Sequence, residues 1–149
     1  MTLETGDKAP DFSLIADNGK PFKLSSKLKN NALLVFYPGD DLPVCKQQLS
    51  DYRDSYSEFN DLNVDVIAIS SDDASTIKSF KKDHDLPFTL LSDGDGEVSK
   101  MYDSFGWFGV KRSVYLVDKN FEIKYKHIES VSIYSRSVEE LTEMIKRKV

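Results

Sequence analysis

The sequence predicts an α/β protein with a mixed central β-sheet, flanking helices and an N-terminal β-hairpin. Three observations lead to this prediction. Two largely apolar segments, residues 32–37 and 64–70, have the length and the residue types of strands that are buried on both faces. A helical stripe of apolar residues lies between them, and a hairpin pattern followed by an amphipathic segment comes after them. Strands that alternate with helices are typical of a sheet covered by helices.

Each element has a local signal. At the N-terminus, alternating apolar residues at 12–14 and 22–24 surround a turn at 17–20, which predicts a hairpin that caps the sheet. A helix is then expected immediately after Cys45, because four apolar residues there recur at spacings of three and four. These residues are Leu49, Tyr52, Tyr56 and Phe59.

The second half of the chain continues the alternation. A helix is expected from Asp73 to about Asp83, capped by Asp72 or Asp73 and with Ile77 and Phe80 facing inward. The remaining expected elements are a strand at 88–91, a short helix at 96–105, a hairpin of 113–117 and 121–125, and an amphipathic helix at 137–148 through Val138, Leu141 and Ile145. Together these elements best fit a thioredoxin-like α/β sandwich.

Size and charge narrow the classes of function. The chain has 149 residues, 40% hydrophobic and 30% charged, which predicts one domain, 1–149, with one core. The formal charge is −5 and the two signs are interspersed, so a nucleic-acid partner is not expected. Residues 1–12 have neither a basic flank nor an apolar stretch, and no apolar run is long enough for a bilayer. We therefore expect a cytoplasmic protein without a membrane partner.

Cys45 is the only cysteine, and it follows a strand and a proline-bounded loop at the start of a predicted helix. The first turn of a helix leaves backbone N–H groups unpaired, and these groups stabilise an anion such as a thiolate. The alternative is a small buried hydrophobic residue, which is the commoner role of a lone cysteine. A single cysteine also agrees with a reducing compartment.

The motif Pro38-x-x-x-Leu42-x-x-Cys45 resembles the P-x-x-x-T/S-x-x-C signature of the peroxiredoxins, the AhpC/TSA family. The local sequence around Cys45, Asp-Asp-x-Pro-x-Cys, is most similar to that of the bacterioferritin-comigratory branch of this family. Further stretches resemble the family in the same order along essentially the whole chain. They are residues 6–12, 69–72, 86–88, 90–93, 95–98 and 112–118.

The resemblance implies a thiol peroxidase and assigns roles to individual residues. Cys45 would be the peroxidatic nucleophile, Arg112 its activating cation, Pro38 a cover against water, and Gln48 the residue that helps to hold the arginine. Leu42 and Val44 would line the substrate pocket. Plain structural roles stay open beside these: Arg112 as an exposed strand-end arginine, and Pro38 as a strand breaker.

The electrostatics independently favour a cation near Cys45. Lowering a thiol pKa from about 8.5 to about 6 requires roughly 3.4 kcal/mol. A helix N-terminus supplies about 0.3 to 1 kcal/mol, and about 2 at best. Lys46 is adjacent in sequence but is expected to point about 100° round the helix, so Arg112 is the better candidate.

Two departures from the family pattern shape the expected activity. The Thr or Ser of the signature is Leu42 here, which makes no hydrogen bond and predicts a slow peroxidase or a preference for bulkier, apolar hydroperoxides. The position five residues after Cys45, where many relatives carry a resolving cysteine, is Ser50. The resemblance is therefore to a one-cysteine peroxiredoxin. Its sulfenic acid would be reduced by thioredoxin, glutaredoxin, a low-molecular-weight thiol or a second copy of the chain.

The sequence also gives expectations about cofactors, metals, oligomeric state and an alternative function. No cofactor or metal is expected, because His84 and His127 are far apart and residues 93–97 suit helix capping better than a calcium loop. The protein is expected to be a monomer or a loose homodimer. Residues 106–109 would form a loop at the core edge, at the peroxide pocket or at a dimer contact. The alternative function is a weakly active redox sensor or interaction protein, in which Cys45 is oxidised once.

Overall fold

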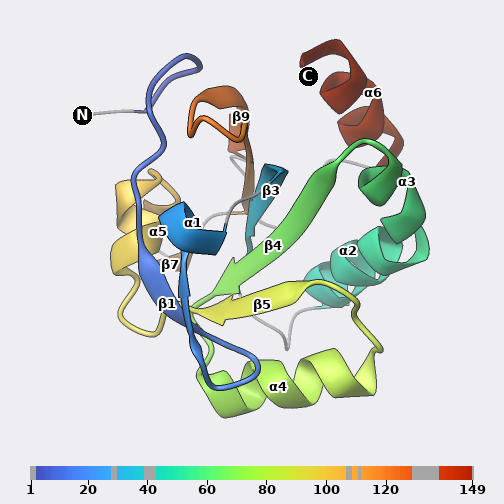
Figure 1. Cartoon of the computed structure of the whole chain (residues 1–149). Helices are drawn as coiled ribbons and strands as arrows, with labels where there is room; N and C mark the ends of the chain where they lie inside the picture. The colour runs from blue at the N-terminus through green and yellow to red at the C-terminus, as the bar shows by residue number, and fades with distance from the viewer. Residues whose placement is uncertain are drawn as a thin grey trace.

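The structure is a computed structural model that describes residues 3–27, 30–38, 43–106, 109–110, 112–128 and 138–148 (Figure 1). Within these residues, seven strands form one sheet in the order β2-β1-β5-β4-β3-β8-β9. The neighbours β3, β4 and β5 are parallel, whereas the other pairings are antiparallel. The predicted mixed sheet with an N-terminal hairpin is therefore confirmed. The strands are β1 (Ser13–Ala16), β2 (Pro21–Lys23), β3 (Asn31–Phe36), β4 (Val64–Ser70), β5 (Thr89–Ser92), β8 (Ser113–Val117) and β9 (Ile123–Ile128).

Helices cover both faces of the sheet. In Figure 1, α2, α3 and α6 lie on the right of the sheet and α1 and α5 on the left, while α4 runs along the bottom beside β5. A separate short hairpin of β6 (Phe105–Gly106) and β7 (Gly109–Val110) precedes β8. The helices are α1 (Leu24–Lys27), α2 (Pro43–Asp54), α3 (Tyr56–Asp61), α4 (Ala74–Asp83), α5 (Glu97–Met101) and α6 (Val138–Lys148). None of the helices in the described ranges has the length and apolar character needed to cross a membrane.

The core has two layers, one on each face of the sheet. Along β3, Leu33 and Val35 pack with the layer under α2, α3, α4 and α6, whereas Leu34 and Phe36 pack with the layer under α1 and α5. This alternation explains why β3 is a continuous apolar run, because successive side chains enter opposite layers. The two central strands identified from the sequence are thus the ones that separate the two layers.

The apolar stripe after Cys45 is divided between two helices. Leu49, Tyr52 and Phe59 are fully buried, as the spacing predicts, and Tyr56 is half-buried. The helix is interrupted at Ser55, whose φ of −110° and ψ of 18° lie outside the helical region. Neither glycine nor proline marks this break, so residue propensities do not reveal it.

Further boundaries differ from the sequence prediction. The strand expected at 121–125 is β9, which spans Ile123–Ile128. Leu24, expected at the end of the hairpin strand, begins α1. The helix expected at 96–105 ends at Met101, because Asp103 takes a left-handed conformation with φ 56° and Ser104 N–H donates to the Ser99 carbonyl at 2.7 Å. This is a Schellman motif with aspartate at the position where glycine is usual. Because no glycine stands there, no signal in the sequence indicates that the helix ends at this point. The expected helix at 73–83 is confirmed as α4, with Asp73 rather than Asp72 as its cap.

Candidate active site

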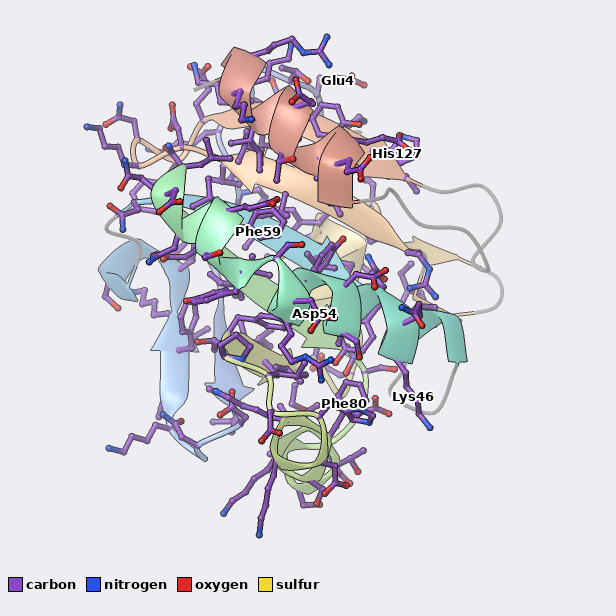
Figure 2. The ribbon with its side chains drawn as sticks, turned by 90° about the vertical axis from the view of Figure 1, so that its right-hand side faces the viewer. Glu4, Lys46, Asp54, Phe59, Phe80 and His127 are labelled. Atoms are coloured by element: carbon purple, nitrogen blue, oxygen red, sulfur yellow. The ribbon has the colours of Figure 1, made fainter. Side chains whose placement is uncertain are left out.

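Cys45 stands in the first turn of α2, directly beyond the carboxyl end of β3. Pro43 begins the helix, a position where proline costs nothing because the N–H it lacks would be unpaired. The backbone of residue 45 therefore lies where N–H groups are open to an anion. The side chains of Val44 and Cys45, and Leu42 as a whole, fall outside the described part of the structure. Lys46 is exposed and points away from the protein (Figure 2).

Arg112 reaches this end of the sheet through strand pairing. Phe36, the last residue of β3, pairs with Ser113, the first residue of β8, in an antiparallel register. Arg112 immediately precedes Ser113, so it lies beside the point where β3 leads toward α2. Its side chain is 1% exposed, which excludes the alternative of a solvent-exposed strand-end arginine.

Gln48 brings Arg112 into contact with α2. The guanidinium Nη1 of Arg112 donates a short hydrogen bond to Gln48 Oε1. Gln48 Nε2 in turn donates to Tyr52 Oη at 2.9 Å, one helical turn further along α2. All three residues are buried: Gln48 is 3% exposed and Tyr52 0%. The structure therefore brings together two of the predicted site residues and adds a third polar group.

Tyr52 is the residue that the sequence interpretation missed, because it was assigned only to the apolar stripe. Burial raises its pKa to about 12, although the Gln48 hydrogen bond and the Arg112 charge both lower it. The phenol is therefore neutral at physiological pH. The available signal was the spacing of Gln48 and Tyr52, since residues four apart on a helix are neighbours.

Pro38 and a pair of serines lie at the same ends of β3 and β8 as Arg112. Pro38 is half-buried and follows β3 by two residues, at the start of the segment that leads to α2. On the β8 side, the hydroxyls of Ser113 and Ser104 are 2.5 Å apart, and both residues are buried.

The acidic segment at residues 93–97 serves the start of α5. The buried Asp93 carboxylate accepts the backbone N–H groups of Val98 and Ser99 at 3.2 and 2.8 Å, together with the Ser99 hydroxyl at 2.8 Å. Its oxygens are used for capping, in agreement with the interpretation of this segment. In the described ranges, no group of three or more His, Cys, Asp or Glu side chains is arranged to hold a metal ion.

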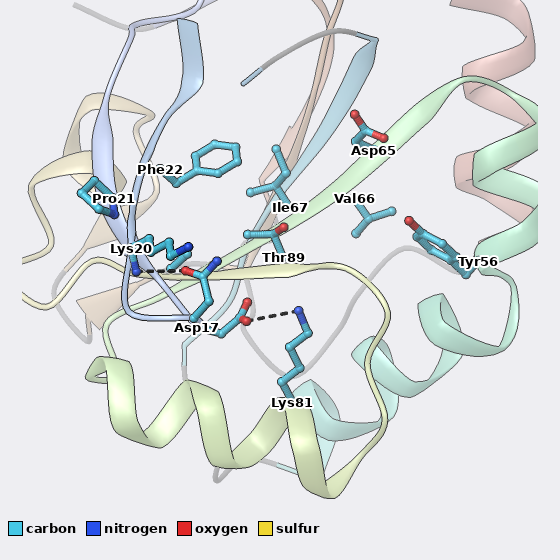
Figure 3. A pocket seen from close by; sticks show the side chains of 12 residues that line it. Asp17, Lys20, Pro21, Phe22, Tyr56, Asp65, Val66, Ile67, Lys81 and Thr89 are labelled. Atoms are coloured by element: carbon cyan, nitrogen blue, oxygen red, sulfur yellow. Dashed lines mark hydrogen bonds and ion pairs between the residues drawn. The ribbon is translucent and has the colours of Figure 1, made fainter. Parts of the chain in front are cut away.

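A separate hollow of about 370 Å³ lies at the opposite end of the parallel strands (Figure 3). Its lining includes Ile67 and Thr89, near the amino ends of β4 and β5. Asp17 forms an ion pair with Lys81 there at 3.2 Å, and burial raises the pKa of Asp65. Ligands of open α/β sheets bind beyond the carboxyl ends of the strands, which is where α2 begins and not where this hollow lies.

Comparison with solved structures defines the class of this fold. A peroxidoxin BcpB from Mycobacterium tuberculosis matches with a TM-score of 0.88 and 25% identity over 97% of both chains. The reduced 2-Cys peroxiredoxin of Plasmodium vivax matches with a TM-score of 0.87 and 26% identity, over 96% of this chain and 94% of its own. The protein has the thioredoxin-like fold of the peroxiredoxins.

The sequence comparisons give the family. The pattern of the AhpC/TSA family matches residues 5–126, and the chain belongs to that family. It is 38% identical to peroxiredoxin Bcp of Bacillus subtilis over 127 residues, which cover 80% of this chain and 81% of that protein. A putative peroxiredoxin bcp of Coxiella burnetii is 41% identical over 130 residues, covering 87% and 79%. Chloroplastic peroxiredoxin Q of Arabidopsis thaliana is 42% identical over 121 residues, covering 79% of this chain and 56% of the plant protein.

Proposed function

We propose that this chain, a thiol-dependent peroxidase of the AhpC/TSA family, reduces hydrogen peroxide and organic hydroperoxides with Cys45 as its nucleophile. The observation that carries the assignment is the buried contact between Arg112 and Gln48. Gln48 is three residues after Cys45, and residues three apart share one face of a helix. The contact therefore holds a guanidinium against the face of α2 that carries residue 45, within about one helical turn.

The reaction begins with an ionised thiol. The Cys45 thiolate attacks one peroxide oxygen, a sulfur–oxygen bond forms and the O–O bond breaks. The departing oxygen takes the electron pair of that bond and a proton, and leaves as water or an alcohol. The sulfur is oxidised to a sulfenic acid. Arg112 and the unpaired N–H groups of the first turn of α2 stabilise the negative charge that develops on the breaking bond.

The energetics explain why both elements are needed. The helix N-terminus alone provides at most about 2 of the roughly 3.4 kcal/mol that a thiol pKa near 6 requires. A cation within about 4 to 6 Å commonly lowers a neighbouring pKa by about 1 to 3 units, which covers the remainder. Pro38, half-buried at the end of β3, limits the access of water, and Val44 contributes to the wall of the peroxide pocket.

The catalytic cycle is completed by an external thiol. The sequence contains one cysteine, so no second cysteine of the same chain resolves the sulfenic acid. Thioredoxin, glutaredoxin or a low-molecular-weight thiol attacks the oxidised sulfur, releases water and forms a mixed disulfide, which a second thiol reduces. The protein works as a monomer or loose homodimer in the cytoplasm, where such thiols are kept reduced. Neither nucleic acid nor a membrane takes part.

Leu42 sets the rate and the substrate preference. It stands where the family signature has a hydroxyl, so one hydrogen bond to the reacting atoms is lost. A missing contact of this type costs about 10²- to 10³-fold in rate. The aliphatic side chain favours bulky, apolar hydroperoxides over hydrogen peroxide.

Peroxide consumption by the full chain tests the assignment. Wild-type protein is mixed with hydrogen peroxide or a lipid hydroperoxide in the presence of thioredoxin, glutaredoxin or a small thiol, with Cys45→Ser as the inactive control. We expect sustained turnover with at least one thiol, a lipid hydroperoxide preference, and a trappable sulfenic acid on Cys45. A single stoichiometric oxidation without turnover would instead support a redox sensor, a function that the loss of the hydroxyl at Leu42 favours.

A further inference from the structure

The orientation of the Gln48 side chain follows from the chemistry of its neighbour. A guanidinium has five N–H donors and no acceptor, so only the carbonyl oxygen of Gln48 can face Arg112. The NH₂ group of the same amide must then point the other way. It points to Tyr52, whose phenolic oxygen accepts from Nε2 at 2.9 Å.

Burial makes this orientation depend on Tyr52. Gln48 and Tyr52 are 3% and 0% exposed, so water does not compete freely for the amide. A buried N–H group without an acceptor is costly, so an amide that has lost the Tyr52 hydroxyl must shift to find another acceptor, and this shift weakens its bond to Arg112. A rotated amide would present N–H donors to the Arg112 guanidinium, which cannot accept them.

We propose that Tyr52 is a positioning residue for the peroxidase reaction: its hydroxyl fixes the Gln48 amide so that the carbonyl holds Arg112 against the start of α2. This inference rests on the proposed function, because it acts through Arg112. Tyr52 itself does not touch the peroxide. Its effect reaches the thiol through two hydrogen bonds in sequence.

The network also preserves the charge of Arg112. Burial keeps the pKa of Tyr52 near 12, so the phenol stays neutral and accepts the amide hydrogen without adding a charge. Gln48 is neutral as well. Together they orient the guanidinium without cancelling the positive charge that a thiolate requires.

A packing role for Tyr52 is separable from this one. The Tyr52 ring packs edge-on against Phe59, with ring centroids 5.8 Å apart. Phenylalanine keeps that contact and removes only the hydroxyl, so Tyr52→Phe isolates the hydrogen bond. Tyr56→Phe is the matched control, because Tyr56 is half-buried beside the same core layer and lies on α3, outside the network.

The experiment measures the rate of Cys45 oxidation by hydrogen peroxide as a function of pH, in a single-turnover format with full-length protein. We expect the midpoint of the pH profile to rise by about one unit in Tyr52→Phe, with an approximately tenfold slower reaction at pH values below both midpoints. Tyr56→Phe is expected to retain the wild-type profile. A purely structural role would lower the melting temperature without moving the midpoint.

Gln48→Glu supplies the second arm. A carboxylate offers an acceptor oxygen in either orientation, so it needs no hydroxyl to point it at Arg112. Tyr52→Phe is therefore expected to have little effect on the pH midpoint in the Gln48→Glu background. An equal shift in both backgrounds, or no shift in the Gln48 background, would overturn the inference.

Two further measurements separate the possible failures. If Arg112→Ala moves the pH midpoint while Tyr52→Phe does not, the Tyr52 inference fails and the proposed function stands. If Arg112→Ala has no effect, the role proposed for Arg112 fails and the Tyr52 inference fails with it, whereas peroxide turnover by the wild-type protein still tests the proposed function. In the wild-type protein, NMR should show slow solvent exchange of the Gln48 Nε2 protons and their proximity to the Tyr52 ring. Fast exchange would contradict the inference even if Tyr52→Phe did not fold.

Discussion

Phe36 pairs with Ser113 across the antiparallel boundary between β3 and β8, and this pairing determines where Arg112 lies. The residue before Ser113 is thereby placed beside the carboxyl end of β3, from which the chain runs to α2. Arg112 and Gln48 are 64 residues apart in sequence and nevertheless share a buried hydrogen bond. The sheet register thus brings a cation from one strand to a helix that follows another.

Leu42→Thr restores the hydroxyl of the family signature. We expect faster reduction of hydrogen peroxide, by about 10- to 10³-fold, because the new hydroxyl contacts the reacting oxygen atoms in the transition state. Stopped-flow peroxide consumption measures this rate, and Leu42→Val controls for the change in side-chain volume. The preference for lipid hydroperoxide should fall in Leu42→Thr. An unchanged or slower reaction with hydrogen peroxide would mean that Leu42 does not limit the chemistry.

Asp17 connects the N-terminal hairpin to β5 and α4. Its carboxylate accepts the Leu90 backbone N–H at 2.9 Å and faces Lys81 Nζ at 3.2 Å. Leu90 is fully buried, so Asp17→Ala leaves an N–H without its acceptor and should cost about 1 to 3 kcal/mol of unfolding free energy.

Lys81→Gln is the matched variant, because it removes only the partly exposed ion pair of Asp17. It should cost at most about 1 kcal/mol. Urea unfolding of both variants tests whether Asp17→Ala loses more unfolding free energy than Lys81→Gln. Equal losses would show that the ion pair, rather than the Leu90 hydrogen bond, fixes the hairpin.

Tyr52, Tyr102 and Tyr115, three of the buried tyrosines, should make the protein sensitive to alkali. Burial raises the pKa of Tyr52 to about 12 and raises the pKa of Tyr102 and Tyr115 as well. A phenol that ionises at about pH 10 when unfolded but later when folded contributes its full stability below pH 10 and loses it as pH rises toward the folded pKa. For Tyr52 this loss falls between about pH 10 and pH 12, with a slope of up to about 1.4 kcal/mol per pH unit.

Ultraviolet titration of phenolate absorbance checks this expectation. Tyr52, Tyr102 and Tyr115 should ionise only together with the loss of far-UV circular dichroism. Tyr52→Phe should reduce the steepness of the stability loss. Complete ionisation of all tyrosines at pH 10.5 with an intact fold would contradict the assigned burial.

The sequence was most informative where residue pattern and burial are directly linked. The apolar runs of β3 and β4 and the cap at Asp73 are local features, so their spacing alone predicted them. The end of α5 was not predictable in this way, since Asp103 adopts a left-handed conformation that glycine usually marks. The break between α2 and α3 at Ser55 likewise has no glycine or proline that would predict it.

The residues of the candidate site were likewise predicted only in part. The resemblance around Cys45 supplied Arg112 and Gln48 as expected partners, and their contact in the structure is consistent with the roles proposed for them. Tyr52 could not be distinguished from its apolar neighbours in the sequence. The spacing of a buried stripe shows that a tyrosine ring is packed in the core, but it does not show which group its hydroxyl contacts. The hydrogen bond between Tyr52 and the predicted site residue Gln48 was recognised only in the structure, where Arg112 lies on the other side of the amide.

The most direct test of the account is the ionisation of Cys45, measured by the rate of thiol alkylation against pH in the wild-type protein and in Arg112→Ala. Arg147→Ala, which removes an exposed cation at the end of α6, is the control. We predict a wild-type thiol pKa well below about 8.5, a rise of about 1 to 3 units toward that value in Arg112→Ala, and no change in the control. A wild-type thiol that titrates near 8.5, or the same pKa with and without Arg112, would contradict the claim that this arginine activates Cys45.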